Sequence, residues 1–286
     1  MASNYSRRIA VATLIGELTG STLRVSTVRS AQAEALLPFP NAYCEAAKDA
    51  YSRILSLFPA KKEEGVNSHL DFTVVFGCSR GLCGGLDAKL AAGAKSYINN
   101  NEGYAVFGER TAALLGVAPL GNDLPDYACC EELAGKISEM IEKGSVTRVR
   151  ILRSEGEGIS ETFVFPVERA EKGYLVTDLP REELLADLRV RYLAAVLFLE
   201  AVKGYAAQQK SRLRSMDRAS ENAEKLKEEL ISADRRERQE QIKTPSPRER
   251  FTSLPRRSET LRTSRNGRSR RFRRSILSPQ RTRATV

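Results

Sequence analysis

The chain has 286 residues, and its 46 Lys and Arg against 36 Asp and Glu give a formal net charge of +10. Residues 244–286 hold thirteen Arg, no Lys and two acids, a net of +11, whereas residues 1–243 hold 33 basic and 34 acidic side chains, a net of −1. This distribution excludes a uniformly basic protein, and the overall charge says nothing about the partners of the nearly neutral body.

Neither a membrane helix nor an export signal is favoured. No stretch reaches the ~20 apolar residues that a membrane helix needs, and the most apolar run, residues 192–202, is interrupted by Glu200. The apolar run near the N-terminus ends early at Glu17, which argues against a signal peptide.

The cysteines and the single histidine, His69, do not have the spacing of a metal site. The five cysteines form no C-x-x-C pair, and zinc and iron–sulfur sites depend on closely spaced thiolate or imidazole ligands. We therefore predict no metal and no cofactor, and interpret the cysteines as small, partly buried thiols in a reducing cytosol. They are Cys44, Cys78, Cys83, Cys129 and Cys130.

Residues 5–58 are predicted to be mostly helical, with a break at Pro38 and Pro40 and a second helix over residues 42–57. Gly16, Gly20 and several β-branched residues weaken the helical pattern. Apolar side chains recur at Ile9, Ala12, Leu18, Leu23, Val25, Val28, Ala31, Ala35 and Leu36.

The middle of the chain alternates between strands and helices. The predicted strands are residues 71–76, 104–107, 146–152, 162–166 and 174–177. The predicted helices are residues 86–98, 111–115 and 131–143. This alternation predicts an α/β fold with a mostly parallel sheet.

A third region, from residue 181 to about Ile242, contains no proline and only one glycine, Gly204. Its apolar residues follow in steps of three, four or seven, the seam of a coiled coil. They are Leu185, Leu188, Tyr192, Val196, Leu199, Val202, Ala206, Leu213, Met216, Ala219, Ala223, Leu226 and Leu230. A helix this long must pack along another long helix, and the N-terminal segment is the only candidate.

The predicted architecture is therefore a Rossmann-like α/β domain inserted between N- and C-terminal helices that form an antiparallel coiled coil. We place the N-terminal helical segment at residues 1–62, the α/β domain at 63–179 and the long C-terminal helix at 180–243. Residues 244–286 form an Arg/Ser-rich tail that we predict to be disordered.

The glycine-rich turn at residues 77–85 is the obvious candidate site. Such turns can hold phosphate through backbone N–H groups, but this one lacks both G-x-x-x-x-G-K-[ST] and G-x-G-x-x-G. We favour a structural role in a tight turn, with a nucleotide-binding enzyme as an alternative. His69 has no supporting motif around it, so no catalytic residue is predicted.

The Arg-rich tail has three interpretations. It could neutralise the phosphates of a nucleic acid, it could be a disordered appendage, or it could be a wrong continuation of the chain. A frameshift in GC-rich DNA tends to yield such Arg/Ser/Pro-rich text, and the change at Thr244-Pro245 is abrupt. Resequencing the gene across these codons would decide.

Two segments resemble one family. Residues 76–87 resemble the S-D-R-G-L-C-G-G-[FL]-N turn of the γ subunit of F-type ATP synthases, through Arg80, Gly81, Leu82, Cys83, Gly84 and Gly85. Residues 212–223 resemble that family's R-M-x-A-M-x-x-A-T-x-N-A helix, and Arg238, Gln239 and Ile242 match its R-Q-x-x-I-T text. Residues 107–112 and 179–185 look more like the γ subunits of the alternative, N-type ATPases.

The resemblance implies a non-catalytic central rotor shaft that couples ion flow to ATP synthesis or hydrolysis. It implies α and β subunits, ε and the membrane c-ring as partners, and no nucleic acid. It also implies a peripheral position at the cytoplasmic face of a prokaryotic membrane. Shaft contacts and packing are carried over to Arg212, Met216, Asn222, Ala223, Arg238, Gln239 and Ile242. Arg7 and Arg8 are interpreted as ordinary surface charges.

The sequence of this chain departs from the family's motifs in ways that affect these expectations. Ser79 and Asp87 replace Asp and Asn of the turn, and Gln208 replaces a frequent Glu. After Ile242 the family continues as the helical tip of the shaft, whereas Pro245 ends the helix here. We therefore expect poor coupling. The alternative is a nucleic-acid-binding coiled-coil protein that uses the basic tail.

Overall fold

The structure, a computed structural model, describes residues 4–58, 71–99, 103–122, 124–156, 158–170 and 180–243. His69, the predicted strand at 174–177 and the tail at 244–286 lie outside these ranges. The chain divides into two units, Met1–Arg236 and Glu237–Val286. In the second unit the structure describes residues 237–243, which are helical.

The predicted helices and strands that fall on described residues are confirmed, with ends shifted by about four residues or fewer. The break near Pro38 is also confirmed, at Leu37. In chain order the elements are α1 (Asn4–Leu36), α2 (Pro38–Ser56), β1 (Asp71–Phe76), α3 (Leu86–Asn99), β2 (Gly103–Phe107), α4 (Glu109–Leu115), α5 (Tyr127–Glu142), β3 (Arg148–Glu155), β4 (Gly158–Phe165) and α6 (Arg181–Lys243).

The four strands form one mixed sheet in the order β2-β1-β3-β4. β1 pairs in parallel with both β2 and β3, whereas β4 pairs antiparallel with β3 as a hairpin. Gly156 between β3 and β4 has a φ of 60°, a left-handed conformation that suits a tight hairpin turn. The sheet is therefore mostly parallel, with one antiparallel edge strand.

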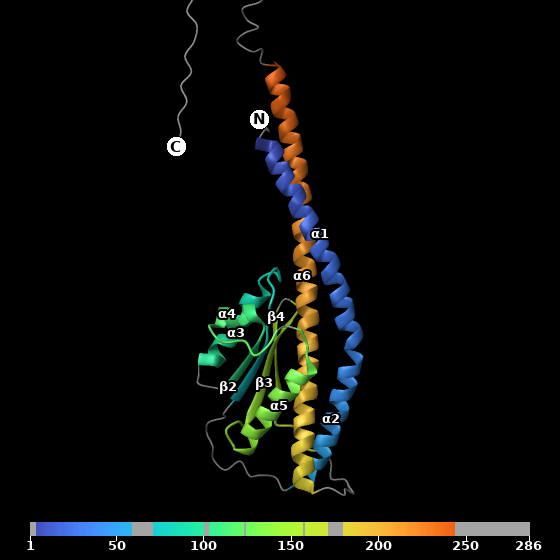
Figure 1. The fold of residues 1–286 in the computed structure, drawn as a ribbon, viewed down its shortest axis with the longest axis vertical. Coiled ribbons are helices and arrows are strands. Elements are labelled where there is room, and N and C mark those ends of the chain that lie inside the picture. The colour runs from blue at the N-terminus through green and yellow to red at the C-terminus, as the bar shows by residue number, and fades with distance from the viewer. Residues whose placement is uncertain are drawn as a thin grey trace, which may run out of the picture. The chain divides into compact units, whose positions relative to one another are not determined.

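Helices cover both faces of the sheet because the side chains of β1 alternate between two cores. Phe72 and Val74 face a core shared with α5 and α6, whereas Val75 faces a smaller core shared with α3 and α4. Figure 1 shows α3 and α4 on one side of the strands and α6 on the other. The carboxyl end of β1 thus opens directly beside α6.

α1 packs along α6 in the opposite chain direction (Figure 1). Ala33, near the end of α1, packs with Tyr205 and Ala206 of α6. Ala12, near the start of α1, lines a groove together with Leu230, much further along α6. Residues early in α1 therefore lie near residues late in α6, and residues late in α1 lie near earlier residues of α6, so the two helices are antiparallel.

The buried face of α1 consists of small side chains. Ala12, Thr19, Ser26 and Ala33 are buried at intervals of seven residues. Thr19 Oγ1 donates to the Ile15 carbonyl oxygen at 2.9 Å, so its hydroxyl is satisfied within the helix. Small residues at heptad spacing let two helix backbones approach closely.

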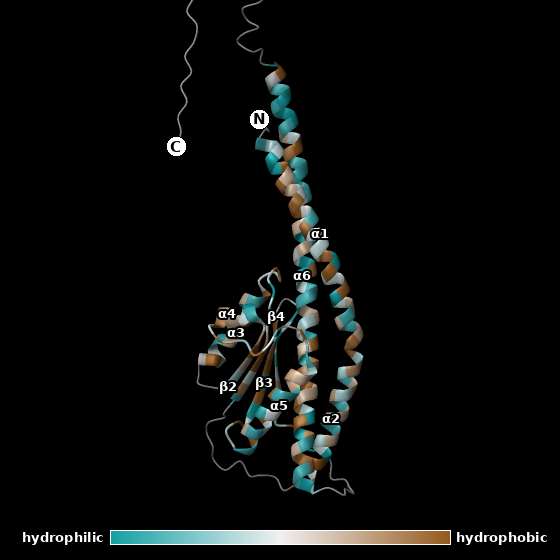
Figure 2. Cartoon of the chain, in the orientation of Figure 1, coloured by the Kyte–Doolittle hydropathy of each residue, from teal (hydrophilic) through white to brown (hydrophobic). Residues whose placement is uncertain are grey.

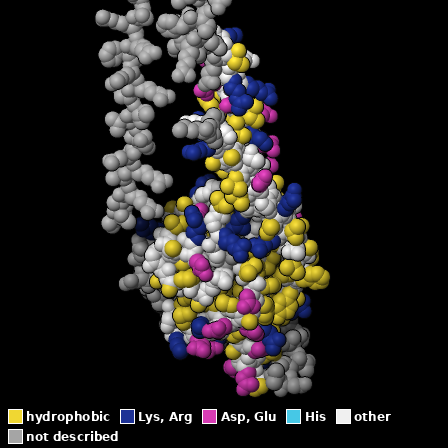
Figure 3. Space-filling model, turned by 45° about the horizontal axis from the view of Figure 1, so that its top comes forward, with side chains coloured by type: hydrophobic (Ala, Val, Ile, Leu, Met, Phe, Trp, Pro, Cys, Tyr) yellow, Lys and Arg dark blue, Asp and Glu magenta, His cyan; other side chains and the backbone are white. Residues whose placement is uncertain are grey.

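Most of the large apolar residues of α1 lie on its exposed surface. Figure 2 shows brown segments along this helix, and Figure 3 shows hydrophobic side chains at the surface among Lys and Arg. Leu18, for example, is 59% exposed. We call this set the α1 apolar stripe: Val11, Leu14, Ile15, Leu18, Val25 and Val28.

Candidate functional site

The turn that follows β1 has an unusual backbone. Leu82, Gly84 and Gly85 have φ values of 69°, 60° and 79°, all in the left-handed region. Glycine adopts this region freely, but a leucine is strained there by about 1–2 kcal/mol. Leu82 is also 61% exposed, so the strain is not offset by burial of its side chain.

Gly77 begins the turn and is required by a close approach to α4. A Cβ atom at this position would lie 2.3 Å from Cβ and Oγ1 of Thr111. The Thr111 hydroxyl accepts a hydrogen bond from the Cys78 backbone N–H at 2.8 Å, and the Gly77 N–H donates to the Phe107 carbonyl at 3.0 Å. The structural interpretation of this glycine is therefore supported.

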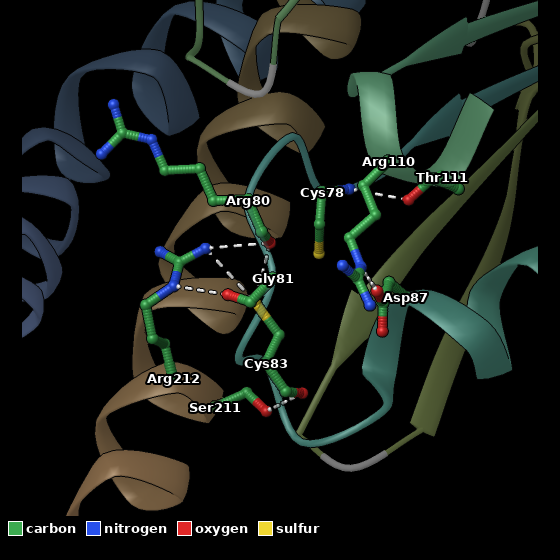
Figure 4. A network of polar contacts seen from close by, with 9 residues as sticks. All are labelled: Cys78, Arg80, Gly81, Cys83, Asp87, Arg110, Thr111, Ser211 and Arg212. Carbon is green, nitrogen blue, oxygen red and sulfur yellow. Dashed lines mark hydrogen bonds and ion pairs between the residues drawn. The ribbon is translucent and has the colours of Figure 1, made fainter. Parts of the chain in front are cut away.

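Arg212 of α6 reaches the other side of the turn (Figure 4). Its side chain donates to the carbonyl oxygens of Gly81 and Arg80, from Nε at 3.2 Å and from Nη2 at 3.3 Å. Nη1 donates to Gln209 Oε1 at 2.9 Å. Only 5% of Arg212 is exposed, so a buried guanidinium ties the long helix to the turn backbone.

Two neighbours on the same face of α6 add further contacts. Ser211 Oγ donates to the Cys83 carbonyl at 2.9 Å, and Gln208 Nε2 donates to the Gly77 carbonyl at 2.9 Å. Positions 208, 211 and 212 share one helical face because they are three and four residues apart. We call this contact between residues 77–85 and residues 208–212 the turn–helix joint.

Two buried thiols lie inside the turn–helix joint. The hydrogen bond between them raises the pKa of Cys78, which burial raises further, and lowers the pKa of Cys83. Arg212 Nη2 lies 3.3 Å from Cys83 Sγ, and its positive charge also lowers the Cys83 pKa. The positively charged guanidinium of Arg212 thus lies directly against the sulfur of Cys83 and favours its thiolate form.

An ion pair closes the outer side of the turn. Arg110 of α4 binds the carboxylate of Asp87 at the start of α3, and Asp87 is almost fully buried. This hydrogen bond and charge raise the pKa of Arg110. The Arg110 backbone N–H also donates to the Cys78 carbonyl at 3.1 Å. The turn is therefore held from α4 as well as from α6.

α6 is anchored to the sheet and α5 at two earlier levels. Arg189 Nε donates to Ser138 Oγ of α5 at 2.8 Å. Glu200 forms a buried ion pair with Arg153 of β3. The anchors from position 189 to position 212 span roughly 35 Å of helix at 1.5 Å per residue.

The structure brings together the turn residues and Arg212, but not the remaining predicted shaft residues. Met216 and Ala223 are buried, whereas Asn222 is exposed. Arg238 and Gln239 are exposed and belong to the second unit, as does Ile242, which is 81% exposed.

Sequence reasoning missed Gln208, Gln209 and Ser211 as members of the joint. A usable signal was present, because these polar residues surround Arg212 at helical spacing in an otherwise apolar helix face.

The joint has the chemistry of a mechanical connection. Its donors are used on backbone carbonyls and on a neighbouring amide. Among the described residues, no group of three or more His, Cys, Asp or Glu side chains could hold a metal ion. None of the described helices is apolar over a sufficient length to cross a membrane.

Comparisons with known proteins agree on one family. The family model described as ATP synthase matches residues 2–244, so the match ends where the Arg-rich segment begins. The ATP synthase gamma chain of Rhizobium rhizogenes strain K84 is 24% identical over 205 residues, covering 61% of this chain and 70% of that protein.

A solved structure shares the fold. It is a chain in the central stalk and c-ring of the Tetrahymena thermophila mitochondrial ATP synthase, with a TM-score of 0.54 and 13% identity. The alignment covers 71% of this chain and 99% of that one.

Proposed function

This chain belongs to the ATP synthase family as a γ subunit, the non-catalytic central-stalk subunit of rotary ATP synthases, and we propose that its turn–helix joint transmits torque. Torque passes between the α/β domain and the long helix α6. The observation that carries the proposal is the meeting of the two family motifs, one in the turn and one around Arg212.

Anchoring at several levels suits α6 to this task. A single contact would act as a hinge, whereas the contacts of Arg189, Glu200 and Arg212 hold the helix along roughly 35 Å. Rotation of the α/β domain then turns the helix as one body. Each orientation of the shaft favours a different conformation of the catalytic subunit that it faces.

The shaft itself is, in this proposal, an antiparallel coiled coil of α1 and α6. The support is the seven-residue spacing of buried residues on both helices and the ion pair of Lys210 with Glu34 at 2.8 Å. On α6 the buried series is Val202, Gln209, Met216, Ala223 and Leu230. The α1 apolar stripe would then face the α and β subunits that surround the shaft.

The predicted shaft residues divide into two roles in this proposal. Met216 and Ala223 pack against α1, since both are buried. Asn222, Arg238, Gln239 and Ile242 contact the surrounding subunits, and Arg7 and Arg8 remain ordinary surface charges.

The remaining assignments rest on the family resemblance. The α/β domain is Rossmann-like and occupies residues 63–179, between helical segments 1–62 and 180–243. It rests with ε on the c-ring, at the cytoplasmic face of a prokaryotic membrane, in an N-type ATPase. Neither a cofactor nor a nucleic acid is required, and the coupling ion is chosen by other subunits.

Co-purification tests the function directly. The full chain, tagged and co-expressed with α and β subunits, should retain both through a wash in 0.5 M salt. Leu18→Ser in the α1 apolar stripe should weaken retention, whereas Lys89→Ser, an exposed change on α3, should not. Salt-sensitive retention of nucleic acid without α and β would instead favour the nucleic-acid alternative, which the comparisons do not support.

A further inference from the structure

A cavity of about 240 Å³ lies at the carboxyl ends of β1 and β2, beside the start of α5 and against α6. Its lining is Phe76, Gly77, Phe107, Gly121, Asn122, Leu124, Pro125, Asp126, Cys129, Cys130, Ala201 and Gln208. An engineered cavity of about 150 Å³ holds benzene. This space therefore accommodates one ring with a short substituent, but not a nucleotide.

One buried side-chain polar atom in the cavity lining has no partner among the described residues. Gln208 is 1% exposed, and its Nε2 donates to the Gly77 carbonyl, which fixes the orientation of the amide. Its Oε1 is buried and accepts no hydrogen bond from the described part of the chain. A buried acceptor without a donor is destabilising, and a ligand with an N–H group would remove that penalty.

The charges of the lining favour a cation over an anion. Among the described lining residues Asp126 is the one ionised group, and none is Lys or Arg. Burial raises the pKa of Cys130 to about 12, so this thiol stays neutral and does not compete with the carboxylate for the cation. Phe76 and Phe107, stacked at 5.0 Å, supply an aromatic wall.

We propose that this cavity binds a small primary amine with an aromatic or apolar body. The ammonium group donates to Gln208 Oε1 and is neutralised by Asp126, while the body packs between the phenylalanine wall and Ala201. Because the lining joins the sheet edge, α5 and α6, the bound amine would stiffen the contact between the domain and the long helix.

The test uses the full chain and benzylamine as the probe, with benzoate and benzyl alcohol as matched ligands of similar size. Cys129 is the reporter, because it lines the cavity and is half-buried, whereas the other four cysteines are buried. Saturating benzylamine should slow alkylation of Cys129 by at least fivefold, as followed by peptide mass spectrometry, and should raise the melting temperature. Benzoate should do neither.

Variants separate the cavity from general effects. Ala201→Leu fills the space from α6 and should weaken benzylamine binding at least tenfold. Gly121→Ala adds a Cβ 3.4 Å from the Phe107 ring and is a second filling variant, should the first fail to fold by circular dichroism. Gln208→Met removes the acceptor, and Gln32→Met, an exposed change on α1, is its control and should bind as the unaltered chain does.

Three outcomes would overturn the proposal. One is equal protection of Cys129 by benzylamine and benzoate. Another is equal protection by benzyl alcohol, because the charge of Asp126 would then play no part. The third is the absence of protection by 20 mM benzylamine, which would mean that water alone fills the cavity and satisfies Gln208.

Discussion

Replacement of Arg212 by methionine should loosen the turn–helix joint without unfolding the rest of the chain. Methionine keeps much of the apolar length of the arginine side chain but cannot donate to the carbonyl oxygens of Gly81 and Arg80. Gln209 Oε1 also loses its donor, and Gln209 is almost fully buried. The effect should therefore be concentrated at the turn.

The magnitude follows from these contacts. A hydrogen bond from a charged donor is worth about 1.5–3 kcal/mol, and an orphaned buried acceptor costs about 1–3 kcal/mol. Arg80 is exposed and Gly81 is half-buried, so water can replace the donor at their carbonyls and the cost there is small. We expect a local loss of about 3 kcal/mol, which corresponds to a roughly 100-fold rise in the opening equilibrium.

Hydrogen exchange followed by mass spectrometry measures this opening. The amides of Leu86 and Lys89, which donate to the carbonyls of Cys83 and Gly85 in the turn, should exchange roughly 100-fold faster in Arg212→Met than in the unaltered chain. The control is Arg214→Met, which removes an exposed arginine two residues further along the same helix. If the two variants exchange within threefold of each other at the turn, Arg212 does not hold the joint.

Three further predictions concern other parts of the structure. Gly77→Ala should lower the free energy of unfolding by about 2 kcal/mol or more because of the clash with Thr111, whereas Gly20→Ala, with open space around it, should raise it by about 0.5–1 kcal/mol in the same denaturation series. Ser26→Leu should lower the melting temperature, because a large side chain cannot fit at a buried position between α1 and α6, where overpacking costs about 1–3 kcal/mol. An assembly containing this chain should hydrolyse ATP but pump ions poorly into vesicles, and removal of residues 244–286 should not restore pumping, since the sequence after Ile242 departs from that of the family's helical continuation.

Each of these three predictions would be contradicted by a specific result. Equal stabilities for the two glycine variants would mean that the turn relaxes away from α4. An unchanged melting temperature for the leucine variant would place position 26 outside the helix contact. Ion pumping at the rate of a well-coupled enzyme would refute the expectation of poor coupling.

Local pattern was sufficient to predict most of the fold. The β-branched and aromatic run at residues 71–76 predicted a buried strand, and all of β1 is buried in the structure. The first residues of α5 and β4 were harder to predict from the sequence. α5 begins at Tyr127, where the side chain of Asp126 accepts a hydrogen bond from the Ala128 N–H, a cap within a loop that the apolar pattern does not mark. β4 begins at Gly158, because pairing with β3 extends it beyond its apolar residues.

The site was only half predictable. The glycines of the turn could be assigned a structural role, but the contact of Arg212 with Gly81 joins residues 131 positions apart, and no periodicity carries that information. The Oε1 of Gln208, which has no partner among the described residues, could not be predicted either, because that property depends on the packing of segments far apart in the sequence.

α1 shows why apolar periodicity misleads when a helix has two partners. The apolar pattern of this helix is dominated by Leu18, Val25 and Val28, yet these side chains are exposed and the small residues between them face α6. A helix that exposed six large apolar residues to water would gain nothing from them in a chain that acts alone. The arrangement is consistent with a shaft enclosed by other subunits. Close backbone contact between α1 and α6 keeps the diameter of the helix pair small, and the large side chains contact the surrounding subunits.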